Sequence, residues 1–166
     1  DDLTPENVPA TSENENEYVG AALFRNGLMV GYLDGLETCL LNAIHGASVF
    51  FSYSFEGMPV SLRSRGVSGL KIESGEDGRL RIAFRLRFNA IADLKTPPLE
   101  EIRNTLREDL EQLLAKCQAL GVEPFGFAAQ AARGVASLAD WEEYGWPERF
   151  ENAEFAVEVE IDLTDT

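Results

Sequence analysis

The feature that most constrains the fold is a pair of segments in which apolar and polar residues alternate. They read RLRIAFRLRFNAI at 79–91 and AEFAVEVEIDL at 153–163. Alternation with a period of two places the apolar side chains of a strand on one face, so both segments predict β-strands with one buried face. The opposite faces carry charges of opposite sign: Arg79, Arg81, Arg85 and Arg87 in the first segment, and Glu154, Glu158, Glu160 and Asp162 in the second.

The arginine stripe has two interpretations. It could bind an anionic ligand, or it could pair with the acidic stripe on a neighbouring strand. Opposite charges across strands contribute about 0.2–1 kcal/mol per pair, whereas like charges on one face repel each other. We therefore expect the two segments to be neighbouring strands with their charged faces on the same side of a sheet.

Segment 96–121 changes the hydrophobic period from two to that of an α-helix. Thr96 can cap the helix start, Pro97 suits the first turn and Gly121 can end the helix. The apolar positions form a single stripe: Leu99, Ile102, Leu106, Leu110, Leu113, Leu114, Cys117 and Leu120. Because only one face is apolar, we expect the helix to lie across a sheet. The predicted fold class is α+β, with a mainly antiparallel sheet of about five to seven strands and this long amphipathic helix packed across one face.

A β-hairpin is expected near the start of the chain. Two short apolar runs, 18–25 and 28–33, meet at Asn26 and Gly27. An Asn-Gly pair readily supplies the two positive φ angles of a type I′ turn, which makes it a strong local signal for a hairpin.

A capped helix is expected directly after this hairpin. Asp34 stands where an N-cap belongs, and Glu37 follows three residues later, as in a capping box. The helix should end near His45, with Gly46 in the left-handed conformation. The joint between hairpin and helix therefore has an architectural explanation. The remaining elements are expected to be strands at 48–55, 60–65 and 69–73, a short helix near 125–132 and a helix or turn at 139–144.

Charge and length limit the classes of function. The chain has 166 residues and a formal net charge of −15. Nucleic acid and unaided docking on anionic lipid are disfavoured, since both require clustered Lys and Arg. We expect one domain at 18–166, preceded by a flexible acidic linker at 1–17. The chain starts with Asp1 and has no signal-peptide pattern, so we expect it to be a fragment or processed form of a longer protein.

The sequence offers little chemistry. His45 is the single histidine, which excludes a multi-histidine zinc site, and the glycines match neither a P-loop nor a dinucleotide fingerprint. We expect no catalytic, cofactor-binding or metal-binding residue, and an enzyme is disfavoured. Cys39 and Cys117 lie on the apolar sides of helical patterns, which favours buried free thiols over a disulfide. We expect the aromatic side chains of Trp141, Trp146 and Phe150 in the core under a loop rather than in an exposed patch.

The order of these pieces resembles the C-terminal domain of the Ger(x)C family of spore germination lipoproteins. The family pattern Gly-Leu-Ala-Val-Phe-Lys…Leu-Val-Gly-Trp-Leu…Glu-Thr is similar to GAALFRNGLMVGYLDGLET at 20–38, where Tyr32 replaces the usual Trp and Asp34 is the expected cap. The matching residues of this first block are Phe24, Val30, Gly31, Leu33, Glu37 and Thr38.

Two further blocks carry the resemblance. GVEPFGFA at 121–128 resembles the family stretch Gly-Ala-Asp-Ile-Phe-Gly-Phe-Gly through Gly121, Phe125, Gly126 and Phe127, and departs from it at Glu123, Pro124 and Ala128. The third block consists of Trp141, then Trp146 and Phe150, then an alternating terminal strand.

The resemblance implies a function. It implies a non-enzymatic lipoprotein subunit of a nutrient germinant receptor, working in spore germination beside integral-membrane subunits. The full-length protein would be held on the outer face of the spore inner membrane by an N-terminal lipid anchor absent from this chain, and this fragment would be soluble. Two rivals remain: an extracytoplasmic solute- or cell-wall-binding module with a pocket lined by Tyr53, Trp141 or Trp146, and an enzyme with a polar cleft around His45.

Overall fold

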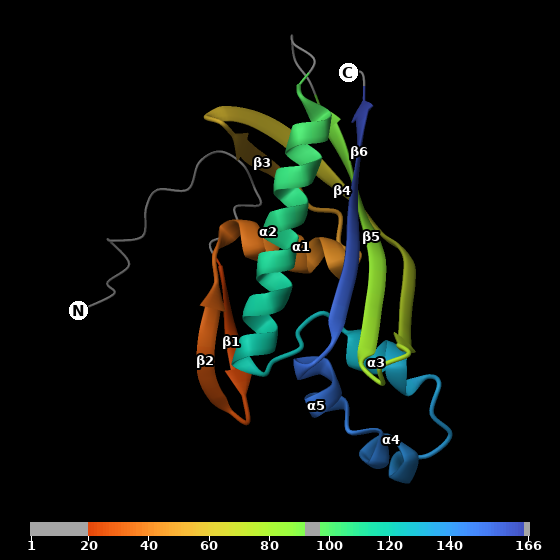
Figure 1. The fold of residues 1–166 in the computed structure, drawn as a ribbon. Coiled ribbons are helices and arrows are strands. Elements are labelled where there is room, and N and C mark those ends of the chain that lie inside the picture. Colours follow the sequence, from red (N-terminus) through yellow and green to blue (C-terminus); the bar gives the residue numbers. More distant parts are fainter. Residues whose placement is uncertain (1–19, 92–96, 165–166) are drawn as a thin grey trace, which may run out of the picture.

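The computed structural model describes residues 20–91 and 97–164. As predicted, the protein is α+β (Figure 1), but the described strands divide between a two-stranded and a four-stranded sheet. The expected linker at 1–17 and the expected cap Thr96 lie outside the described residues.

The elements follow one another along the chain with short connections, apart from the one that includes the undescribed residues 92–96. The strands are β1 (Ala21–Arg25), β2 (Leu28–Leu33), β3 (Phe50–Phe55), β4 (Met58–Ser74), β5 (Leu80–Ile91) and β6 (Glu154–Thr164). The helices are α1 (Gly35–Ile44), α2 (Leu99–Leu120), α3 (Phe127–Ala132), α4 (Leu138–Tyr144) and α5 (Trp146–Glu151).

The four-stranded sheet has the order β3-β4-β5-β6. β3, β4 and β5 pair antiparallel, as expected for strands joined by tight turns. β6 pairs with β5 in parallel. A parallel pair needs a long crossover, and the stretch from α2 to α5 provides it.

The predicted pairing of the two charged stripes is confirmed. Arg85 lies opposite Glu158 in the register of β5 and β6. The Arg85 guanidinium is 2.7 Å from the Glu158 carboxylate and 3.5 Å from that of Glu160. Arg79 and Glu154 form a further pair at 3.1 Å. The glutamates of β6 therefore neutralise much of the arginine stripe.

The expectation of two separate strands at 60–65 and 69–73 is wrong. The chain forms one long strand, β4, whose pairing with β5 is interrupted at two places. Gly66 and Gly69 stand at these interruptions with φ angles of 83° and 65°. Glycine adopts such angles without a steric penalty, so each bulge takes up extra residues while the strand continues.

The start of one helix and the presence of another differ from expectation. α2 begins at Leu99 with Pro98 as its N-cap, so Pro97 is not in the first turn. The residue before a proline is disfavoured in the helical region, which keeps Pro97 outside the helix. The segment Trp146–Glu151 forms α5, which the sequence reading did not include.

α2 and the sheet enclose the main core. α2 runs beside β6, and α1 crosses behind α2 (Figure 1). The predicted apolar stripe of α2 is confirmed, with Leu99 and Leu120 partly buried at its two ends. The fully buried residues of the stripe are Ile102, Leu106, Leu110, Leu113, Leu114 and Cys117, and those of β5 include Ile82, Leu86, Phe88 and Ala90.

Cys39 of α1 and Cys117 of α2 are buried and unpaired, as favoured from the sequence. Burial raises the pKa of each thiol to about 11. The thiols are therefore uncharged at neutral pH and act as small apolar groups in the core.

We predict that Arg85→Gln lowers the midpoint of thermal unfolding more than Arg81→Gln. Both arginines are exposed on β5, but Arg81 has no ion pair within 4.0 Å among the described residues. The difference should shrink in concentrated salt, which screens exposed charges. Equal midpoints for the two variants at low salt would contradict a stabilising role for the Arg85 pairs.

We predict that both thiols resist an aqueous disulfide reagent at pH 8 until the protein unfolds. A thiol with a raised pKa holds little reactive thiolate at that pH.

The two buried thiols should also make the free energy of unfolding depend on pH. Their contribution to stability should be complete below the unfolded pKa of about 8.5 and should fall as the pH rises through about 11, because the thiols lose their protons first in the unfolded state. Urea unfolding at several pH values measures this decline. Rapid labelling of the folded protein would show the prediction to be wrong.

Candidate functional site

The joint between the hairpin and α1 is built as the sequence predicts. Asn26 and Gly27 have positive φ angles of 51° and 80°. The Glu37 amide donates to Asp34 Oδ1 at 2.8 Å, and the Asp34 amide donates to Glu37 Oε2 at 2.9 Å. The Thr38 hydroxyl donates to the Asp34 carbonyl at 2.7 Å. The capping box is therefore complete, and Thr38 adds a third local bond.

Glu37 also links this joint to α2. Lys116 Nζ lies 2.8 Å from Glu37 Oε2, and the same ammonium lies over the Tyr32 ring at 5.4 Å from its centroid. The hydrogen bond to Glu37 raises the pKa of Lys116. The sequence reading missed this contact, since no local pattern relates residues so far apart in the chain.

Gly31 and Gly121 allow the hairpin to approach the end of α2. A Cβ atom on Gly31 would lie 2.8 Å from Leu120 Cδ1, closer than packed atoms allow. Gly121 ends α2 with a φ of 66°, and a Cβ atom there would lie 2.6 Å from Arg25 Nη1. Gly31 and Gly121 belong to the first and second blocks of the family resemblance, and both permit close packing between the hairpin and the end of α2.

The second block forms a tight turn before α3. The Glu123 carboxylate accepts hydrogen bonds from the amides of Phe125, Phe127 and Ala128 at 2.8, 3.1 and 3.0 Å. Glu123 thus satisfies backbone groups that the start of a short helix leaves free. Sequence reasoning noted Glu123 only as a departure from the family pattern.

His45 has a structural contact of its own. Its Nε2 atom is 2.6 Å from the Pro124 carbonyl oxygen, which joins the end of α1 to the turn that precedes α3. The ring is therefore engaged by the backbone, and no observation favours a catalytic role for it.

The third block is a stack of aromatic rings, and the core interpretation is confirmed. Trp141 lies 5.9 Å from Trp146, and Trp146 lies 5.9 Å from Phe150, between ring centroids. Trp146 and Phe150 are buried, and Trp141 is partly buried against them. Tyr53 is also buried, and its hydroxyl donates to Asp109 at 2.7 Å. These side chains pack against protein, which disfavours the ligand-pocket role that the rival module requires.

Two shallow depressions lie next to β6. Their volumes are about 430 and 630 Å³, and both include Arg85, Arg107 and Glu158. Charged side chains make up most of the lining of the smaller depression, whereas the larger one also includes Phe84, Phe155 and Val157. In both, Arg85 is already paired with Glu158. Neither depression is lined by the aromatic residues proposed for a ligand pocket.

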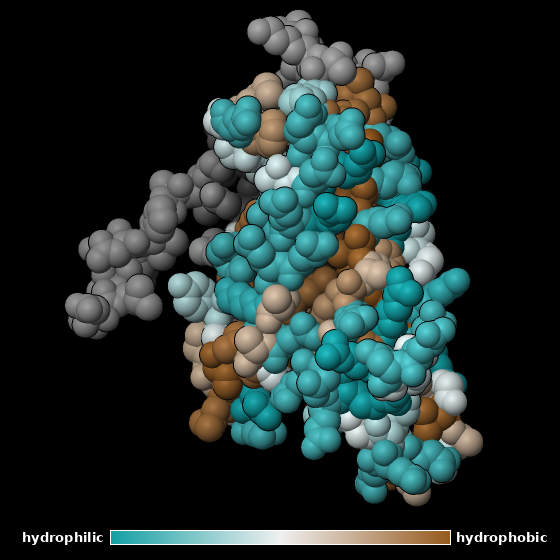
Figure 2. All heavy atoms as spheres, viewed as in Figure 1, coloured by the Kyte–Doolittle hydropathy of each residue, from teal (hydrophilic) through white to brown (hydrophobic). Residues whose placement is uncertain are grey.

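The outer face of the hairpin carries exposed apolar side chains, which packing within the domain does not explain. Phe24, Met29 and Tyr32 are 61%, 59% and 67% exposed, and they share one face because Phe24 lies opposite Met29 and Ala22, two residues before Phe24, lies opposite Tyr32. We name these three residues the hairpin face. Leu28 is 72% exposed beside the turn, but it lies opposite Arg25 and therefore on the other face. Hydrophobic residues gather over β1 and β2 at the lower left of Figure 2.

Phe24 is much more exposed than the other apolar side chains of the three blocks that carry the family resemblance. The others are buried or partly buried: Val30, Leu33, Phe125, Phe127, Trp141, Trp146 and Phe150. Contiguous exposed apolar surface marks interaction sites. The hairpin face is therefore the candidate functional site.

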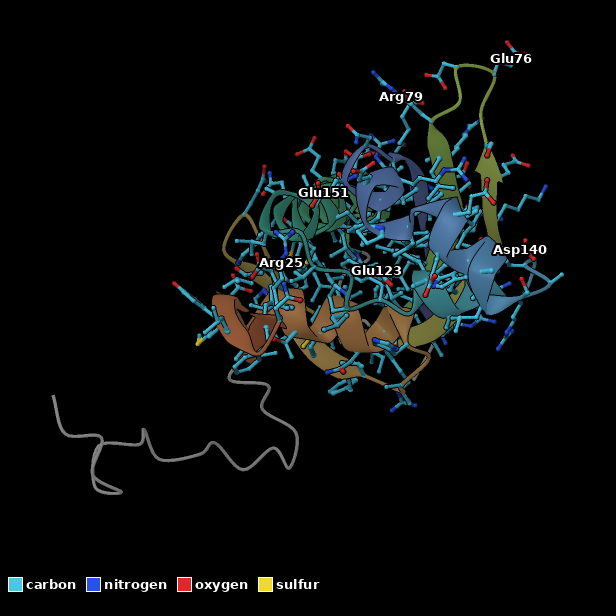
Figure 3. All side chains as sticks on the ribbon, turned by 90° about the horizontal axis from the view of Figure 1, so that it is seen from below. Arg25, Glu76, Arg79, Glu123, Asp140 and Glu151 are labelled. Atoms are coloured by element: carbon cyan, nitrogen blue, oxygen red, sulfur yellow. The ribbon has the colours of Figure 1, made fainter. Side chains whose placement is uncertain are left out.

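Charged groups beside the hairpin face already have partners within the chain. Arg25 lies 3.9 Å from Glu151 of α5, and Lys116 is paired with Glu37. Figure 3 shows Arg25, Glu123 and Glu151 at the same end of the molecule, where the hairpin, α2 and α5 meet. The candidate site thus combines an unpaired apolar surface with a rim of paired charges.

Comparisons with known proteins agree on the fold. The sequence model of the family described as "Spore germination B3/ GerAC like, C-terminal" matches residues 19–166. Among solved structures, the chain is similar to "Crystal Structure of the GerBC protein", with a TM-score of 0.67 and 19% sequence identity. This match covers 87% of the chain and 50% of the GerBC chain, so the chain spans about half the length of that protein. No curated protein sequence matches.

We predict that Asp34→Ala lowers the free energy of unfolding by roughly 0.5–2 kcal/mol, because the Glu37 amide loses its acceptor. Urea unfolding measures the change. Asp34→Asn is the matched control, since an asparagine caps a helix about as well as an aspartate. An Asp34→Ala protein as stable as the wild type would show that the box adds nothing.

Proposed function

The chain belongs to the family of spore germination B3/GerAC-like C-terminal domains, and on that premise we propose that it is part of a lipid-anchored subunit of a nutrient germinant receptor. The subunit acts in spore germination with integral-membrane partner subunits and catalyses no reaction. The match of the family model over residues 19–166 carries this proposal. The similarity to GerBC supports the fold on which the proposal rests.

The chemistry of the described residues supports a contact role over a catalytic one. His45 is held by the Pro124 carbonyl, and burial raises the pKa of both thiols. Within residues 20–91 and 97–164, no group of three or more His, Cys, Asp or Glu side chains could hold a metal ion. Glu37 and Glu123 are likewise engaged, in a helix cap with an ion pair and in hydrogen bonds to backbone amides.

The proposed location is the outer face of the spore inner membrane. None of the helices in the described part of the chain is long and apolar enough to cross a bilayer. The net charge of −15 opposes direct adsorption to anionic lipid. We therefore propose an N-terminal lipid anchor outside this chain, and membrane-embedded partners that carry the signal across the bilayer.

The proposal predicts that deleting the gene slows the response of spores to at least one nutrient germinant and leaves vegetative growth unchanged. The physical reason is that a receptor without one subunit loses contacts on which its assembly depends. The fall in optical density of a spore suspension after adding each nutrient measures the response.

Complementation with the wild-type gene is the control and should restore the response. Deletion spores that respond normally to every nutrient would overturn the receptor role. A deletion that impairs vegetative growth would also overturn it and would favour a general cell-wall-binding module.

A further inference from the structure

We infer that the hairpin face is an interface within one polypeptide: it packs against the part of the protein that precedes this domain. The inference rests on the exposure of Phe24, Met29 and Tyr32, on the description of the family as a C-terminal region and on the greater length of the GerBC chain. It does not depend on the proposed role in germination.

The first argument is the size of the apolar surface. The three side chains of the hairpin face are 59–67% exposed. At the areas typical of large apolar side chains, they present about 400 Å² on one face. The largest apolar patch of a monomeric protein is about 300–600 Å², and such patches are often functional.

The second argument is that only one face of the hairpin is supported. Leu23 and Leu33 on its inner face are buried, and Gly31 lies against Leu120 of α2. An isolated two-stranded hairpin is marginally stable in water, so it depends on packing. The inner face has its support within this domain, whereas the side chains of the outer face are mostly exposed, with Lys116 against the Tyr32 ring.

The third argument concerns the chemistry of the occupant. Arg25 and Lys116 beside the patch are paired with Glu151 and Glu37, so they do not require charges from a partner. Lys116 also contacts the Tyr32 ring, which holds one side chain of the patch in place. The surface therefore suits a mainly apolar partner with a polar margin.

The fourth argument identifies that partner. The family model describes a C-terminal region, and the GerBC chain is about twice as long as the part that matches this chain. A C-terminal region is preceded by the rest of its protein, and the first described strand here is β1, which carries Phe24. A linked segment acts at an effective concentration of about millimolar, so a modest interface suffices. About 400 Å² on each side fits the 600–1,500 Å² total of interfaces between domains of one chain.

Two other occupants fit less well. A bilayer is disfavoured by the net charge of −15. A second copy would bury about 800 Å² in total, which is below the roughly 1,000 Å² expected of a stable dimer. Both remain outcomes of the test below.

The test measures the reaction rate of a thiol placed in the hairpin face by Met29→Cys. The rate is compared between this 166-residue chain and the complete product of its gene, after both are shown to unfold cooperatively. Native Cys39 and Cys117 are buried with a pKa of about 11, so they contribute little background at pH 8. Leu138→Cys is the matched control, because Leu138 of α4 is 74% exposed outside the patch.

We expect the Met29→Cys thiol to react about tenfold more slowly in the complete product, because it becomes accessible only when the interface opens. The Leu138→Cys thiol should react equally in both proteins. Adding Phe24→Ser to the complete product should restore the fast reaction at position 29, whereas adding Leu138→Ser should not. Tyr32→Cys provides a second labelled position if the Met29 variant fails to fold.

Equal rates at position 29 in the two proteins would overturn the inference. Protection of the short chain that increases with its own concentration would assign the face to a second copy. Protection that appears only with phosphatidylglycerol vesicles would assign it to the bilayer. A complete gene product with no further chain would also overturn the inference.

Discussion

The burial of the apolar face of α2 is the interaction on which the rest of the structure depends. Leu106, Leu110 and Leu113 are completely buried, and each such side chain contributes about 1.5–3 kcal/mol. α2 can bury this face only against a sheet that presents a continuous apolar surface, and alternation along β5 and β6 provides one. The C-terminal end of α2 then supports other elements: Gln118 donates to the carbonyls of Phe150 and Ala153, and Leu120 lies against Gly31.

Two exposed surfaces of the fold differ in how far their side chains find partners within the chain. The outer side of β5 and β6 carries many charges, but Arg85 and Glu158 illustrate that they pair with one another. The hairpin face carries apolar side chains that are mostly exposed to water. Water solvates a charged surface well and an apolar surface poorly, so association with another surface gains more at the hairpin. This contrast distinguishes an interaction site from an architectural one.

A contact role is consistent with the way the motif residues are used. Asp34 and Glu37 form the capping box, and Gly31 permits close packing against α2. These residues place the hairpin at the end of α2, while Phe24 is exposed. The same motif thus builds the support and supplies part of the exposed surface. In the proposed receptor subunit, such a surface would suit assembly better than turnover of a substrate.

The sequence by itself determined the local elements and, through the family resemblance, the family. Asn26 and Gly27 specify the turn, Asp34 and Glu37 the helix cap, and the period of two the strand β5, because each signal acts between residues close together in the chain. Opposite charges also identified β6 as the neighbour of β5. Only the tertiary structure decided the parallel direction of β6, the pairing of Glu37 with Lys116 and the exposure of Phe24. These depend on how α2 places distant segments beside one another, and an apolar side chain in a strand has the same local pattern whether its face is covered or open.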